Sequence, residues 1–83
     1  MKKASSSPSF AALKDLIMES LVVDPDDIRP GASLIDDLGA DAVEVADLFV
    51  AVEREWGIEI THEIAARLRT VQDVVDYIEE SAE

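Results

Sequence analysis

The chain has 83 residues, with 19 Asp and Glu against seven Lys and Arg, so its net charge is −12, and it contains no cysteine. This length allows one small domain, and the lack of cysteine excludes disulfides, thiolate metal ligands and a cysteine nucleophile. The negative charge argues against nucleic acid as a partner and favours cationic protein surfaces, and no stretch approaches the roughly 20 apolar residues of a membrane span.

The N-terminal region divides into a lead and a first helix. Residues 1–7 are rich in Ser and Lys, and we expect a flexible lead there. No apolar run follows its two lysines, so the pattern is not that of a secretory signal, and we expect a cytoplasmic location. A first helix is predicted from Pro8, with Ser7 as its N-cap, to Ser20 or Leu21, because apolar residues recur there at helical spacing.

A long loop is predicted after this helix. Two prolines, a glycine and three aspartates lie between Asp24 and Gly31, a composition typical of turns. Leu34 and Ile35 are both expected to pack the end of this loop onto the core.

The second helix is predicted to begin after Asp41. Asp41 and Glu44 have the spacing of a capping box, while Gly39 permits the turn into the helix and Gly57 ends it. Its apolar stripe comprises Val45, Leu48, Phe49, Val52 and Trp56.

Two shorter helices are predicted near the C-terminus. We interpret residues 58–60, Ile-Glu-Ile, as a connecting loop that buries its isoleucines. Thr61 is expected to cap a short third helix that extends through Leu68. Thr70 and Asp73 have the spacing that caps a last helix. We expect its buried side to consist of the residues at i, i+3, i+4 and i+7, namely Val71, Val74, Val75 and Ile78.

These elements predict an all-α fold, a four-helix bundle with a long loop between helices 1 and 2 and a short third helix. We assign residues 8–80 to this domain, residues 1–7 to the lead and residues 81–83 to a C-terminal tail. The domain is expected to be a monomer.

Three segments, in order, resemble the acyl carrier protein family. The run Asp37–Glu44 is similar to the signature in which the family has Asp-Ser-Leu at the start of its second helix. Leu48, residues 51–53 and residues 55–60 are similar to the family's leucine, acidic helix end, aromatic residue and Ile-Glu-Ile exit. Residues 70–73 and 76–78 resemble its last helix. Because several motifs agree at the right separations over residues 8–80, the resemblance is specific.

The resemblance implies a carrier, and not an enzyme. In the family, a serine at the start of the second helix receives a 4'-phosphopantetheine arm from coenzyme A, and the arm carries acyl groups as thioesters. That position is Ala42 here, with Gly39, Asp41 and Val43 beside it as the arm site. Residues 34–60 contain no Ser, Thr or Cys, so we expect no cofactor on this chain, and one 4'-phosphopantetheine if serine stood at position 42.

Two explanations of Ala42 remain open. The chain is either a Ser-to-Ala variant of a carrier of fatty-acid or related acyl-chain biosynthesis, or a natural carrier-like interaction module without a prosthetic group. The intact surroundings of Ala42 favour the variant, although Asp41 and Glu44 would keep their capping role in either protein.

The resemblance also implies a partner surface. In the family, an acidic second helix docks on Arg and Lys of acyl-chain synthesis enzymes and of phosphopantetheinyl transferase. The corresponding candidates here are Asp36, Asp37, Asp41, Glu44, Asp47 and Glu55. Arg54 departs from the family pattern, which is commonly acidic there. The alternative is an ordinary solvated face.

An acyl chain in this family is sheltered by the bundle interior. The pocket candidates are Phe49, Val52, Ile60, Leu68, Val74 and Ile78. Apolar residues at helical spacing are usually only core, and without an arm that interpretation is preferred. Trp56 is expected to be a core aromatic and His62 a surface residue. No catalytic set, metal-ligand spacing or EF-hand pattern is present, so we predict no catalytic or metal site.

Overall fold

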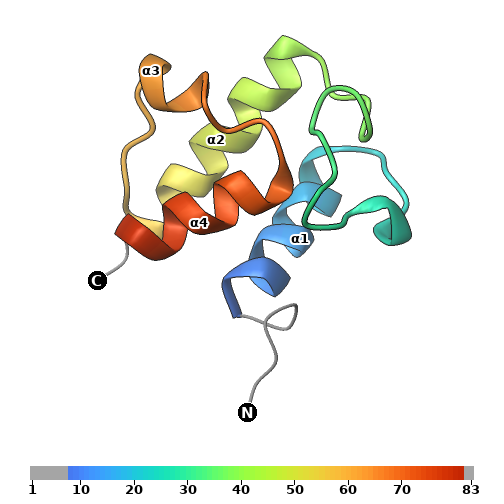
Figure 1. Cartoon of the computed structure of the whole chain (residues 1–83), viewed down its shortest axis with the longest axis horizontal. Coiled ribbons are helices and arrows are strands. Elements are labelled where there is room, and N and C mark those ends of the chain that lie inside the picture. The colour runs from blue at the N-terminus through green and yellow to red at the C-terminus, as the bar shows by residue number, and fades with distance from the viewer. Residues whose placement is uncertain (1–7, 82–83) are drawn as a thin grey trace.

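The computed structural model describes residues 8–81, so the predicted lead at residues 1–7 lies outside the described residues. Within that range the chain folds into four α-helices and one 3-10 helix, and Figure 1 shows how they are arranged. The helices are α1 (Pro8–Ser20), η2 (Pro25–Asp27), α2 (Ala42–Trp56), α3 (His62–Ala65) and α4 (Val71–Ser81). The predicted all-α fold with a long crossover and a short third helix is confirmed.

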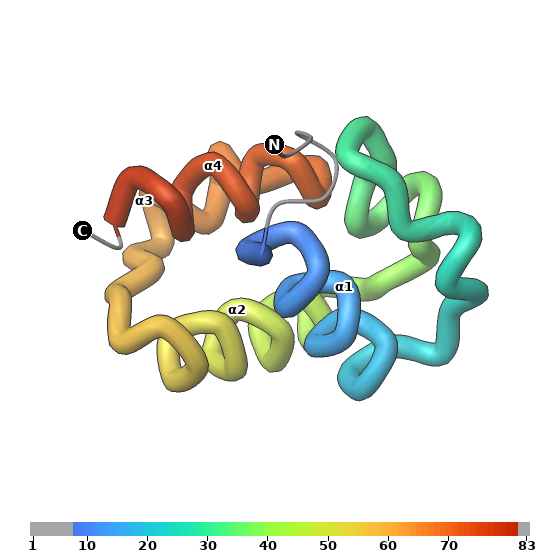
Figure 2. Tube along the Cα trace, turned by 90° about the horizontal axis from the view of Figure 1, so that it is seen from below, coloured from blue at the N-terminus to red at the C-terminus, as the bar shows by residue number. Residues whose placement is uncertain are grey.

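The core forms where α1 packs against both α2 and α4 (Figure 2). Each of the three helices contributes side chains without any exposed surface. These include Leu13 and Ile17 of α1, Leu48 and Val52 of α2, and Val74 and Ile78 of α4. None of the helices within residues 8–81 combines the length and the apolar character that crossing a bilayer requires.

The loop between α1 and α2 is anchored to the start of α4. The backbone N–H of Leu34 donates to the carbonyl of Arg69 at 2.9 Å, and that of Val71 donates to Ala32 at 3.0 Å. Leu34 is buried as predicted, but Ile35 is 58 % exposed, so its predicted packing onto the core is wrong. Leu34 and Leu38 are both buried in the core cluster, while Ile35 lies on the exposed side of the turn between them.

The third helix is shorter than predicted, because α3 ends at Ala65 rather than at Leu68. The next N–H groups, of Arg67 and Leu68, donate to carbonyls only three residues back, so the chain tightens into turns. Leu68 is still buried. Ile58 and Ile60, predicted to be buried, are half-buried and pack against the core.

The last helix has the cap predicted from its sequence. The Thr70 hydroxyl accepts the Asp73 N–H at 3.1 Å, and the Asp73 carboxylate accepts the Thr70 N–H at 3.2 Å. The helix includes Ser81, so the predicted tail does not begin at that residue, and residues 82–83 lie outside the described range.

Candidate functional site

The start of α2 has the predicted geometry, with Ala42 as its first residue. The Asp41 carboxylate accepts the Glu44 N–H at 2.8 Å, and the Glu44 carboxylate accepts the Asp41 N–H at 3.1 Å. Gly39 has φ 73°, a left-handed conformation that favours glycine at this turn. Ala42 is exposed, and Val43 is 69 % exposed. This helix end is therefore capped, and its first two side chains face solvent.

The Ala42 site has no hydroxyl group that could replace a serine. The hydroxyls nearest in sequence belong to Ser33 and Thr61, and each is used locally. The Ser33 hydroxyl accepts the Asp36 N–H at 3.1 Å, and the Thr61 hydroxyl accepts the Ile64 N–H at 3.2 Å. Both are therefore capping groups of other turns, and the covalent attachment of an arm does not fit the residues present.

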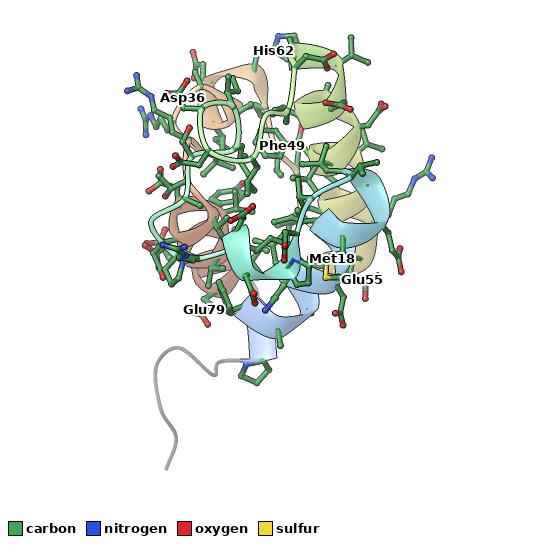
Figure 3. All side chains as sticks on the ribbon, turned by 90° about the vertical axis from the view of Figure 1, so that its right-hand side faces the viewer. Met18, Asp36, Phe49, Glu55, His62 and Glu79 are labelled. Atoms are coloured by element: carbon green, nitrogen blue, oxygen red, sulfur yellow. The ribbon has the colours of Figure 1, made fainter. Side chains whose placement is uncertain are left out.

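An apolar furrow of about 370 Å³ runs beside Ala42, between α2 and α3. It is lined by Ala42, Val45, Ala46 and Phe49 of α2 and by His62 and Ala65 of α3. Figure 3 shows Phe49 in the interior and His62 at the periphery. His62 is exposed, as predicted, but its position across the furrow from Ala42 was not predicted, since 20 residues separate the two in sequence.

A second hollow of about 340 Å³ adjoins the furrow and shares Val45, Ala65 and Ala66 with it. Of the acyl-pocket candidates, Phe49 lines the furrow and Leu68 lines the second hollow. The others line neither: Val52, Val74 and Ile78 are completely buried, and Ile60 is half-buried. The six candidates therefore do not line one cavity together, and most of them are core.

All six acidic candidates are exposed, but they fall into two groups. Three of them have a structural role. Asp41 and Glu44 cap α2, and the Asp37 carboxylate accepts the Ser33 N–H at 2.7 Å. The three whose carboxylates have no such role are Asp36, Asp47 and Glu55. Figure 3 shows Asp36 and Glu55 at the periphery of the molecule.

Two side-chain hydrogen bonds that sequence reasoning missed hold residues 58–60 in place. The Glu53 carboxylate of α2 accepts the Ile60 N–H at 2.7 Å. The Tyr77 hydroxyl of α4 donates to the Glu59 carbonyl. Trp56, at the end of α2, is half-buried and packs against the core, as predicted.

Comparison with known proteins gives consistent results. The chain matches the family described as "Phosphopantetheine attachment site" over residues 11–78. It is 51 % identical to an acyl carrier protein of Bdellovibrio bacteriovorus over 67 residues, which cover 81 % of this chain and 86 % of that protein. A solved structure of acyl carrier protein from Enterococcus faecalis is similar with a TM-score of 0.75 and 29 % identity, and the match covers 88 % of this chain and 92 % of that one.

Proposed function

This chain belongs to the acyl carrier protein family, and on that premise we propose that it is a carrier of fatty-acid or related acyl-chain biosynthesis whose arm position is blocked by Ala42. The observation that supports this most is the start of α2. The cap, the left-handed glycine and the exposed first residue of the helix are all present, and only the hydroxyl is missing.

The usual prosthetic group of the family is phosphopantetheine, and the furrow beside Ala42 is open at that residue. A hydroxyl on residue 42 would stand at the N-terminus of a 15-residue helix, where unpaired N–H groups and partial positive charge favour a phosphate anion. On this proposal the chain is a Ser-to-Ala variant of a carrier.

A natural interaction module without a prosthetic group is the second candidate. It is supported by the exposed Asp36, Asp47 and Glu55, which are available to cationic partners whether or not an arm is attached. In both cases the proposed partners include acyl-chain synthesis enzymes, which would bind at α2. Phosphopantetheinyl transferase is a proposed partner of the carrier, at the same helix. Both proposals place the chain in the cytoplasm as a monomer.

The proposal is tested by restoring the hydroxyl. Ala42→Ser is incubated with coenzyme A and a broad-specificity phosphopantetheinyl transferase, and the intact mass is measured. We expect a gain of one phosphopantetheine group. The matched control is Ala46→Ser, which places a hydroxyl on the same furrow and helix, but one turn beyond the N-terminus, and we expect no gain there.

Because Ala42 is exposed and its side chain takes no part in the cap, the Ala42→Ser chain should fold like the parent. Circular dichroism verifies this before the reaction. A folded Ala42→Ser chain that gains no mass contradicts the carrier proposal and leaves the interaction module.

A further inference from the structure

The outward side of α2 is a stripe of alternating apolar and charged residues, which we call the outer stripe. Its members are Val43, Asp47, Val50 and Arg54, spaced at i, i+4, i+7 and i+11 on the side opposite the buried Leu48 and Val52. Val43 is 69 % exposed and Val50 is 45 % exposed, and both charged members are exposed. The outer stripe therefore offers two apolar side chains, one carboxylate and one guanidinium to solvent.

Arg54 is exceptional in its surroundings. Residues 36–63 contain nine Asp and Glu residues, and Arg54 is their only Lys or Arg. The positions three and four residues away on either side are apolar or glycine, so no carboxylate of α2 is placed for an intrahelical pair. They are Val50, Ala51, Gly57 and Ile58.

A positive charge in the last turn of α2 stabilises the helix through its dipole. Any residue of that charge in the last turn would do this, so the dipole does not explain the position of Arg54 on the outer stripe. Glu55, the next residue, belongs to a different row of the helix together with Glu44 and Ala51.

Resting on the proposed function, we propose that the outer stripe selects partners whose basic docking surface carries one acidic side chain, which pairs with Arg54. Asp47 pairs with a Lys or Arg of the same surface, and Val43 and Val50 contact apolar side chains between the two charges. A partner with only Lys and Arg at this surface meets Arg54 with like charge. Such a like-charge contact discriminates between partners more than an exposed pair adds affinity.

The test compares charge variants of this chain in binding to one defined probe. The probe is a purified carrier-dependent condensing enzyme of acyl-chain synthesis whose carrier-docking surface carries only Lys and Arg. Its affinity is measured by isothermal titration at low salt for the parent chain, for Arg54→Glu and for Arg67→Glu. Arg67 is also exposed but follows α3, and both substitutions change the net charge by the same two units.

We expect Arg54→Glu to bind the probe about three- to ten-fold more tightly than the parent, and Arg67→Glu to differ by less than about two-fold. The gain should disappear in about 1 M salt, where the Debye length is about 3 Å. In a second arm, each Lys and Arg of the probe's surface is reversed to Glu in turn. At least one such variant should prefer the parent chain over Arg54→Glu.

Equal affinities of the parent and Arg54→Glu overturn the inference, and so does an equal gain from Arg67→Glu, which would mean that only net charge matters. No measurable binding by any of the chains also overturns it. These outcomes do not depend on an arm, so they are distinct from a failure of Ala42→Ser to gain mass. A lower thermal midpoint of Arg54→Glu reports the helix dipole and is measured separately.

Discussion

The capping box of α2 yields the sharpest stability prediction, made on the substitution Asp41→Ala. The change removes the carboxylate that accepts the Glu44 N–H at 2.8 Å and takes one negative charge away from the helix N-terminus. Loss of an N-cap side chain costs about 1 kcal/mol, within a range of about 0.5–2 kcal/mol. That figure includes the contribution of the negative charge to the helix dipole, which is about 0.3–1 kcal/mol for a carboxylate in this position.

We therefore expect the free energy of unfolding to fall by about 0.5–2 kcal/mol and the melting temperature by about 4–8 °C for each kcal/mol. A domain of this size has a total stability of roughly 4–12 kcal/mol, so the variant remains folded at room temperature. The assay is urea denaturation followed by far-UV circular dichroism, with the m-value checked for constancy.

Two further variants serve as controls. Asp47→Ala removes the same charge from the exposed middle of α2 and should change the free energy of unfolding by less than about 0.5 kcal/mol. Asp41→Asn keeps the acceptor oxygen and should lose only the contribution of the charge, about 0.3–1 kcal/mol. The capping argument is refuted if Asp41→Ala is as stable as the parent, or if Asp47→Ala is equally destabilising.

Two other predictions concern the C-terminal end of α2 and the hydrogen bond that ties α4 to residue 59. Gly57→Ala should cost about 1–2 kcal/mol in urea denaturation because φ is 65° there, although an added Cβ would meet no atom within 4 Å. Gly31 does not have a positive φ, and an added Cβ there would also meet no atom within 4 Å, so Gly31→Ala should be nearly neutral. Equal losses of stability in the two variants would contradict the strain argument. Tyr77→Phe should cost about 0.5–1.5 kcal/mol by removing the hydrogen bond to the Glu59 carbonyl, and an unchanged urea midpoint would count against that role.

The helix boundaries that could be predicted are those set by groups three or four residues apart. The capping boxes at Asp41 and at Thr70, and the glycine that ends α2, depend only on neighbouring residues. The sequence also contains such a pattern at Ser33, which is followed three residues later by Asp36. The structure forms a related turn there, in which the neighbouring Asp37 accepts the Ser33 N–H.

The features that could not be predicted depend on contacts between distant segments. Leu34 and Ile35 are both apolar and adjacent in sequence, and Leu34 is the one whose N–H bonds to the distant Arg69 carbonyl and whose side chain is buried. The acceptor of that bond, the Arg69 carbonyl, directly follows the segment that was predicted to be helical through Leu68. The chain turns toward α4 at this point. The furrow has the same origin, because its walls on α2 and α3 are about 20 residues apart in sequence.

The structure separates attachment from recognition at the start of α2. The cap is formed by the Asp41 and Glu44 side chains and the N–H groups of the same two residues, so the Ala42 side chain makes no contribution to it. A serine at position 42 would therefore leave the helix end and the outer stripe unchanged. It follows that the affinity of the Ala42 chain for a partner measures the protein surface alone. Measuring the Ala42→Ser chain with its arm attached against the same partner then isolates the contribution of the arm, because both chains present the same α2.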